Sequence, residues 1–255
     1  MVGLFGLFES VPLGGLLESD LRVLLSFPHF DEVVAVRRLE ELRSLGVFSL
    51  VQGGPFRFFG LQLLGRGHTG VVVEANSVFG RVAVKLLRVD ADRLSMGDEA
   101  RFLGVANGVG VGPVLYGWSE GCLVMELVEG PYLQDWLDGL PSVDVVRGLI
   151  RELFWKARRL DVVGLDHGEL AKAFKHVFVC GGVARVIDFE SGSLVRRCQN
   201  VTSLVQFVFL NDYVSCRVGR VLSLPDRDLV IGVLGLYKRG LSDGAFLEVL
   251  RVCGL

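Results

Sequence analysis

Apolar residues follow two different spacings along the chain, and the spacing changes near residue 129. Between residues 144 and 160 they stand at positions 145, 146, 149, 150, 153, 154, 157 and 160, which predicts an amphipathic helix. Upstream, the runs VVVEA, RVAVKLL and CLVMELV predict short strands, with one helix expected near residues 94–105. Downstream, HVFV and ARVIDF flank Gly181 and Gly182 and predict a hairpin within mostly helical sequence. The pattern therefore predicts an α+β fold, rich in strands first and in helices later.

The segment before Pro55 carries a different pattern. Apolar side chains recur at every third position from Val33 to Leu45 and predict a helix that ends before Gly46, and SDLRVLLSF predicts a shorter helix ahead of it. VFSLV, QGGP and FRFFG then predict strand, turn and strand. Helices followed by a hairpin are the outline of a winged helix. We therefore expect three parts: a helical, winged-helix-like extension over residues 1–54, a β-rich part over 55–128 and a helical part over 129–255.

Composition limits the classes of partner. The chain has 27 basic and 29 acidic residues, so its net charge gives no general attraction for polyanions. The five cysteines are scattered without a CxxC pair, which predicts reduced thiols in a cytoplasmic protein. The start of the chain lacks the basic region of a signal peptide, and no apolar run is long enough to cross a bilayer. We therefore expect no membrane partner.

The segment LGRGHTGVVVEA is the first candidate for chemistry, because it places Gly65, Gly67, Gly70 and Val72 in a G-x-G-x-x-G-x-V pattern. In dinucleotide-binding folds such a glycine loop leads into a helix. Here VVVEA predicts a strand, so we expect the glycines to join two strands. A turn of this kind lets backbone N–H groups fold over phosphates.

Two further residues extend the nucleotide hypothesis. Lys85 ends the apolar strand RVAVK, where a buried lysine needs an anionic partner. Glu99 on the following helix is the expected carboxylate, ahead of Asp98 and Glu74. Asp188 follows the strand ARVI, where its carboxylate would bind Mg²⁺, an ion that prefers oxygen ligands.

In this order, the glycine turn, the strand lysine and IDFE resemble the protein-kinase-like superfamily over residues 61–190, with MELV in the position of the hinge and IDFE in place of D-F-G. The resemblance implies a two-lobed fold, with a β-rich lobe and a reduced helical lobe, and ATP (or GTP) with Mg²⁺ in the cleft between them. The residues that it places at the nucleotide are Gly65, Arg66, Gly67, His68, Gly70, Val72, Ala83, Lys85, Glu99, Met125, Glu126, Leu127 and Val128.

The segment DHGELAKAFKHVFV resembles the catalytic loop of RIO-type and Bud32-type atypical kinases. HGEL occupies the position of the H-G-D-L or H-A-D-L motif of these kinases. The resemblance implies that Glu169 takes the place of the catalytic aspartate, which acts as the base, with Asp166 as the alternative base. His176 stands where the family has a Mg²⁺-binding asparagine, so His176 and Asp188 are the implied metal ligands. One of the loop lysines, Lys172 or Lys175, would neutralise the transferred phosphoryl group.

The acceptor is the least constrained part of the prediction. The short remainder of the chain after Glu190 lacks A-P-E, which resembles the small archaeal RIO-like kinases, a branch that includes an RNA kinase acting on a tRNA ribose 2′-hydroxyl. On the helix predicted over residues 144–160, Arg147, Arg151 and Arg158 fall within about 40° of one another at 100° per residue, which favours tRNA or another structured RNA as partner. The alternatives are a serine/threonine protein kinase with a protein acceptor, a Bud32-like accessory ATPase and a nucleotide-binding pseudokinase.

Overall fold

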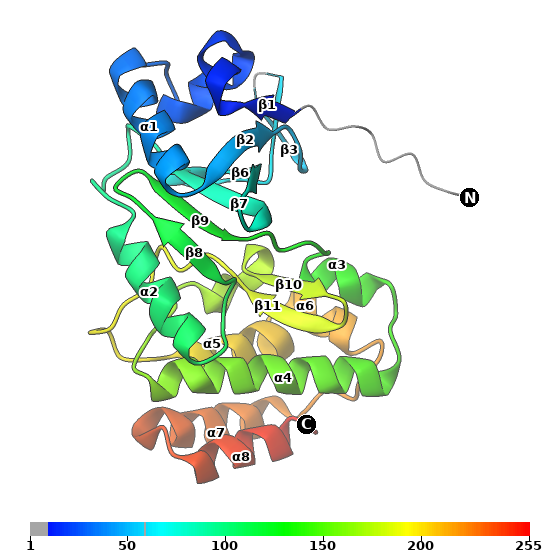
Figure 1. The fold of residues 1–255 in the computed structure, drawn as a ribbon. Coiled ribbons are helices and arrows are strands. Elements are labelled where there is room, and N and C mark those ends of the chain that lie inside the picture. Colours follow the sequence, from blue (N-terminus) through cyan, green and yellow to red (C-terminus); the bar gives the residue numbers. More distant parts are fainter. Residues whose placement is uncertain (1–9, 59) are drawn as a thin grey trace. The chain divides into compact units, whose positions relative to one another are not determined.

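The computed structural model describes residues 10–58 and 60–255, which form antiparallel β-sheets and helices (Figure 1). The predicted α+β class is confirmed. The chain forms two compact units: unit 1 contains Met1–Arg101 and Val114–Leu127, and unit 2 contains Phe102–Pro113 and Val128–Leu255. Helix α2 (Gly97–Gly108) begins in unit 1 and ends in unit 2. None of the helices in the described ranges is long and apolar enough to cross a membrane.

Unit 1 is built on an antiparallel sheet in which seven strands of the described chain take part, in the order β1–β2–β6–β7–β9–β8 with β5 paired to β6. Its strands are β1 (Ser10–Pro12), β2 (Val47–Val51), β5 (Gly65–Arg66), β6 (Gly70–Ser77), β7 (Gly80–Leu87), β8 (Leu115–Trp118) and β9 (Cys122–Glu126). Strands β3 (Phe56–Phe58) and β4 (Leu61–Leu63) pair separately. The chain before β2 forms 3-10 helices over Leu13–Glu18 and Asp20–Ser26 and helix α1 (Glu32–Ser44).

The core of unit 1 lies between this N-terminal segment and one face of the sheet. Side chains alternate along a strand, so Val71 and Val73 of β6 share a face with Val82 and Val84 of β7. Buried leucines from the 3-10 helices and α1 pack on this face in a single hydrophobic cluster. Each fully buried apolar side chain contributes about 1.5–3 kcal/mol before the entropy of folding is counted. The N-terminal segment therefore shares its core with the strands that follow it.

The hairpin predicted over residues 47–58 is wrong. Strand β2 pairs with β1 and β6, and β3 pairs with β4, so no winged-helix-like hairpin forms there. The partners of β2 are strands that are distant from β3 in the sequence, so the pairing is not decided by the turn between β2 and β3. Within that turn Gly54 has φ +111°, and a Cβ there would lie 2.2 Å from the carbonyl oxygen of Leu63, so only glycine fits this close approach to β4. SDLRVLLSF is a 3-10 helix rather than an α-helix.

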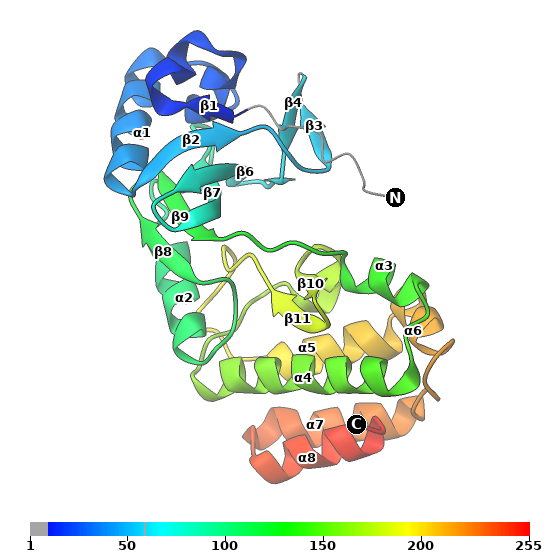
Figure 2. The ribbon, with the colours of Figure 1, turned by 45° about the vertical axis from the view of Figure 1, so that its right-hand side comes forward.

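Unit 2 is organised around the long helix α4 (Val143–Val162), which confirms the helix predicted over residues 144–160. Hairpin β10 (Val177–Cys180) and β11 (Val183–Val186) lies on one side of α4, and the antiparallel pair α7 (Arg227–Gly240) and α8 (Asp243–Val252) lies on the other (Figures 1 and 2). The remaining segments are α3 (Leu133–Asp138), a 3-10 helix over Leu170–Lys175, α5 (Asn200–Val205), a π-helix over Gln206–Leu210 and α6 (Asp212–Val218). The predicted hairpin around Gly181 and Gly182 is also confirmed.

Candidate active site

The glycine motif forms a tight turn between β5 and β6, as predicted, and does not lead into a helix. The N–H of Gly67 donates to the carbonyl of Gly70 at 2.8 Å, and Gly65 pairs with Val72 across the two strands. A Cβ on Gly70 would lie 2.9 Å from the carbonyl oxygen of Leu86. A side chain at this position would displace the neighbouring backbone, so glycine is required by geometry.

Basic side chains surround this turn. Arg66 lies over the ring of Phe58 at 4.4 Å from its centroid, and His68 is exposed. Arg88, which the sequence did not single out, pairs with Asp90 at 2.7 Å and donates to the carbonyl of Gly67 at 3.4 Å. Its only sequence signal was its place shortly after Lys85. Arg88 therefore holds the turn in place by a hydrogen bond, and Arg66 adds a second positive charge at the turn.

The predicted ion pair between Lys85 and Glu99 is confirmed. The two atoms Lys85 Nζ and Glu99 Oε1 are 2.8 Å apart, and each residue is only 3% exposed. A Cβ on Gly70 would also lie 3.1 Å from Lys85 Cγ. The lysine side chain thus packs directly beneath the glycine turn.

An apolar surface continues from Lys85 along the sheet face opposite the core. Val72 is the register partner of Lys85, and Ala83 is the partner of Met125. Alternation along the strands places these four side chains on the same face. A flat heterocycle needs such a surface, so this face suits a nucleobase next to the lysine.

The residues predicted as a hinge lie at the end of β9. The N–H of Glu126 donates to the carbonyl of Val114 at 2.8 Å, and its Oε2 accepts from the Val114 N–H at 3.1 Å. Leu127 is the last residue of unit 1, and Val128 begins the long segment of unit 2. The predicted hinge is therefore one of the three points at which the chain passes from one unit to the other.

Asp166 is a structural anchor in unit 2. It is 4% exposed, and its carboxylate accepts from Arg196 Nε and from the backbone N–H of Gln199 at 2.9 Å. Its backbone also forms two hydrogen bonds of 2.9 Å with Ser193. A carboxylate that is both buried and hydrogen-bonded in this way is out of reach of an acceptor and is a poor candidate for a catalytic base.

Glu169 follows three residues later in the same loop and has a side chain that is 39% exposed. Its Oε2 is 2.8 Å from His176 Nε2, and its Oε1 accepts a hydrogen bond from Ser191 Oγ. The compact 3-10 helix Leu170–Lys175 joins Glu169 to His176 and brings their side chains together. The sequence placed both residues in the loop, but it did not predict this contact or the role of Ser191.

The hairpin β10–β11 brings His176 next to Asp188, because one residue comes before its first strand and the other comes after its second strand, so that both lie at its open end. Val177 pairs with Val186, and the Ile187 N–H donates to the His176 carbonyl at 2.9 Å. His176 Nδ1 is 4.0 Å from Asp188 Oδ2. Asp188 has φ +68°, a left-handed conformation that is uncommon outside glycine and that costs about 1–3 kcal/mol.

His167 supports this arrangement from within the protein. Its ring is buried and packs 4.9 Å from the ring of Phe189, and Nε2 donates to the carbonyl of Ile187 at 3.0 Å, directly before Asp188. Burial, together with the neighbouring His176, lowers the pKa of His167 from 6.5 to about 4. The ring is therefore neutral at physiological pH.

A buried hydrogen-bond network fixes the backbone of His167. The side chain of Asn200 accepts from the His167 N–H at 2.9 Å and donates to the Leu165 carbonyl and to Asp161 Oδ1, each at 2.8 Å. Asp161 Oδ2 accepts from Tyr237 Oη at 2.7 Å. Burial raises the pKa of Asp161, while these donors oppose the rise. Helices α4, α5 and α7 thus hold the loop in place.

The two lysines of the loop are exposed. Within the described residues, neither Lys172 nor Lys175 has an acidic side chain within ion-pair distance. The backbone at Lys172 (φ −128°, ψ 47°) is not helical and kinks the 3-10 segment. Both amines are therefore available to an anionic ligand.

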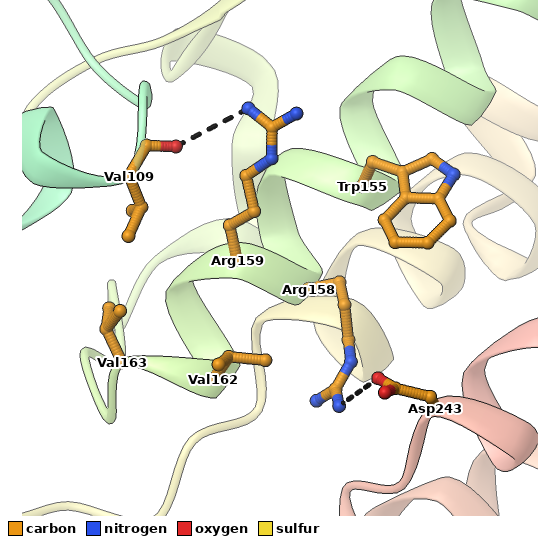
Figure 3. A pocket seen from close by; sticks show the side chains of 7 residues that line it. All are labelled: Val109, Trp155, Arg158, Arg159, Val162, Val163 and Asp243. Carbon is orange, nitrogen blue, oxygen red and sulfur yellow. Dashed lines mark hydrogen bonds and ion pairs between the residues drawn. The ribbon is translucent and has the colours of Figure 1, made fainter.

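The predicted arginine stripe on α4 requires a correction. Arg147 and Arg151 are exposed, but Arg158 is 6% exposed and donates to Asp243 at 2.7 Å (Figure 3). The start of α8 covers this part of the helix. Arg159 is exposed instead and donates to the carbonyl of Val109 at 3.4 Å, and it lines, with Trp155, a surface hollow of about 280 Å³.

No protein-family model matches the chain, and no curated protein matches it in sequence. The arrangement of the side chains is therefore the evidence for the chemistry of the site.

Proposed function

We propose that this protein is an ATP-dependent phosphotransferase of protein-kinase-like fold, which moves the γ-phosphate of ATP to a hydroxyl acceptor with the help of a divalent cation such as Mg²⁺. Within unit 1 we assign the glycine turn, Lys85 and Glu99 to the nucleotide, and within unit 2 we assign Asp188 to the metal and Glu169 to the acceptor. The observation that carries the proposal is the buried ion pair of Lys85 and Glu99 beneath the glycine turn.

This ion pair has no evident value as a source of stability. Replacing a buried salt bridge by apolar residues is often neutral or stabilising, because two charges lose their hydration. Lys85 nevertheless lies next to Gly70 and on the same face as Val72 and Ala83. A cation held under a phosphate-sized turn and beside an apolar surface is suited to a nucleotide, with the phosphates at the lysine and the base on the apolar face.

Unit 2 offers the complementary chemistry. Asp188 holds a carboxylate in a strained backbone conformation, and such strain concentrates at functional sites. Glu169 is the acid that an acceptor hydroxyl can reach, because its side chain is 39% exposed whereas Asp166 is buried and occupied by Arg196. We assign Glu169 as the base and Asp166 as the anchor of the loop. Lys172 and Lys175 would face the negative charge of the transferred group.

For the acceptor we propose RNA, with a tRNA ribose 2′-hydroxyl as the most specific form of the hypothesis. Arg147, Arg151, Trp155 and Arg159 follow one another at four-residue spacing on α4, and all four are exposed. Guanidinium groups neutralise phosphates, and an indole stacks on an unpaired base. A serine/threonine protein kinase is the alternative.

The purified protein, γ-labelled ATP and either bulk tRNA or a protein extract provide the test. We expect the labelled product to be digested by nuclease and not by protease. After complete digestion, we expect the label at the 2′ position of a ribose. Label that protease alone releases would favour the protein-kinase alternative. Nucleotide binding without transfer to either polymer would indicate a pseudokinase and would overturn the proposal.

A further inference from the structure

The environment of His176 indicates which metal ion the site selects. Nε2 lies 2.8 Å from Glu169 Oε2, and a carboxylate accepts hydrogen bonds, so in the neutral ring Nε2 carries the proton. Nδ1 then presents its lone pair. This atom is buried, has no hydrogen-bond partner among the residues that the structure describes, and belongs to a residue that is only 9% exposed.

The ring atom Nδ1 lies close to the carboxylate of Asp188. The separation of 4.0 Å from Asp188 Oδ2 is too long for a hydrogen bond. It suits two ligands of one cation, because two metal–ligand bonds of about 2.1 Å span up to about 4.2 Å. A buried polar atom without a partner is costly, and a bound cation would remove that cost.

Glu169 completes the arrangement from the other side of the ring. Histidines that bind metals almost always donate their second ring N–H to a carboxylate, a backbone carbonyl or a water molecule, which fixes the tautomer and the orientation of the ring. Ser191 in turn donates to Glu169 and holds that carboxylate. A carboxylate oxygen of Glu190 lies within 4.8 Å of one from Asp188 and offers a third ligand.

We propose that His176 Nδ1 and Asp188 Oδ2 bind one divalent cation, and that the imidazole makes this site select Mn²⁺ and other first-row transition ions over Mg²⁺. Mg²⁺ prefers an octahedron of oxygen atoms and gives up its water reluctantly, whereas imidazole is a good ligand for transition metals. The inference names the metal of the site proposed above, but the geometry that carries it does not depend on phosphate transfer. In it Glu169 acts as a positioning residue for His176.

The test is the binding of Mn²⁺ to the whole, nucleotide-free protein, followed by electron paramagnetic resonance. We expect Mn²⁺ to bind at least about tenfold more tightly than Mg²⁺, and the echo-modulation spectrum of bound Mn²⁺ to show coupling to a ring nitrogen. His176→Asn should abolish the nitrogen coupling and the preference for Mn²⁺, and Asp188→Asn should abolish binding. His29→Asn, the same replacement at an exposed histidine, is the matched control and should change neither.

Glu169→Gln tests the positioning role separately and should lower Mn²⁺ affinity by about 10–100-fold, with the nitrogen coupling retained in the fraction that binds. A wild-type spectrum without nitrogen coupling, or equal affinities for the two ions, would overturn the inference even if no variant folds. Mn²⁺ binding with nitrogen coupling but no phosphate transfer would keep the metal site and reject the kinase. Phosphate transfer with Mg²⁺, without nitrogen coupling for bound Mn²⁺, would keep the kinase and reject the proposed metal site.

Discussion

His167 makes the stability of the protein depend on pH in a defined window. The folded ring has a pKa of about 4, compared with 6.5 for an unperturbed histidine. Below pH 6.5 the unfolded chain takes up a proton that the folded protein cannot accept until pH 4, so the free energy of unfolding falls as the pH falls through this range. Each unit of pKa corresponds to about 1.4 kcal/mol, which gives a loss of about 3 kcal/mol at pH 4 from this residue alone.

The variant His167→Gln removes the titration and keeps an amide that can donate to the Ile187 carbonyl. It will be less stable at every pH, so the informative quantity is the change between pH 7 and pH 4, not the absolute value. We expect the free energy of unfolding of the wild type to fall by about 3 kcal/mol more than that of His167→Gln over this interval.

Urea unfolding in metal-free buffer, followed by tryptophan fluorescence, measures this quantity. Trp136 and Trp155 lie in unit 2 with His167, and the replacement Trp118→Phe in all proteins removes the signal of unit 1. His29→Gln controls for the loss of an exposed histidine. Parallel profiles for the wild type and His167→Gln from pH 7 to pH 4 would refute the reasoning, because the buried ring would then not resist protonation.

Three further predictions follow from the site. Glu169→Gln should lower kcat by about 10²–10⁴-fold with little change in ATP affinity, whereas Asp166→Asn should mainly cost about 1–3 kcal/mol of unfolding free energy; steady-state kinetics and urea melts separate the two. Gly70→Ala should weaken the binding of an ATP analogue, measured by calorimetry, and lower the free energy of unfolding by about 1–3 kcal/mol, measured by thermal melts. Gly104→Ala, where a Cβ would meet open space on α2, should change neither quantity. Arg151→Glu should raise KM for RNA, leave KM for ATP unchanged, and reduce the salt slope of RNA binding by about 1.

The parts of the fold that were predicted correctly are those in which the pattern of apolar and turn residues within one segment determines the structure. Helix α4 follows from its apolar spacing, and the hairpin at Gly181 and Gly182 follows from two short strands around a turn. Lys85 and Glu99 were also predicted as a pair, because a buried lysine requires an acid and few were near. In each case neighbouring residues, or a single physical requirement, determine the result.

The predictions were wrong where segments that are distant in the sequence determine the local structure. Strand β2 pairs with β6 and not with the adjacent β3, and no local pattern encodes that choice. Arg158 shares a helix face with Arg147, but the start of α8 covers its end of the helix. The contact between Glu169 and His176 depends on a kinked 3-10 turn whose backbone angles no periodicity predicts.

The central claim is that Lys85 and Asp188 serve the transfer of phosphate from ATP. The most direct measurement is the rate of transfer from γ-labelled ATP to the preferred acceptor at saturating nucleotide, for the wild type, Lys85→Met, Asp188→Asn and the exposed-lysine control Lys238→Met. We predict losses of about 10²–10³-fold or more for the first two variants and an unchanged rate for the control, with all proteins folded by circular dichroism. Transfer at the wild-type rate by either Lys85→Met or Asp188→Asn would contradict the account.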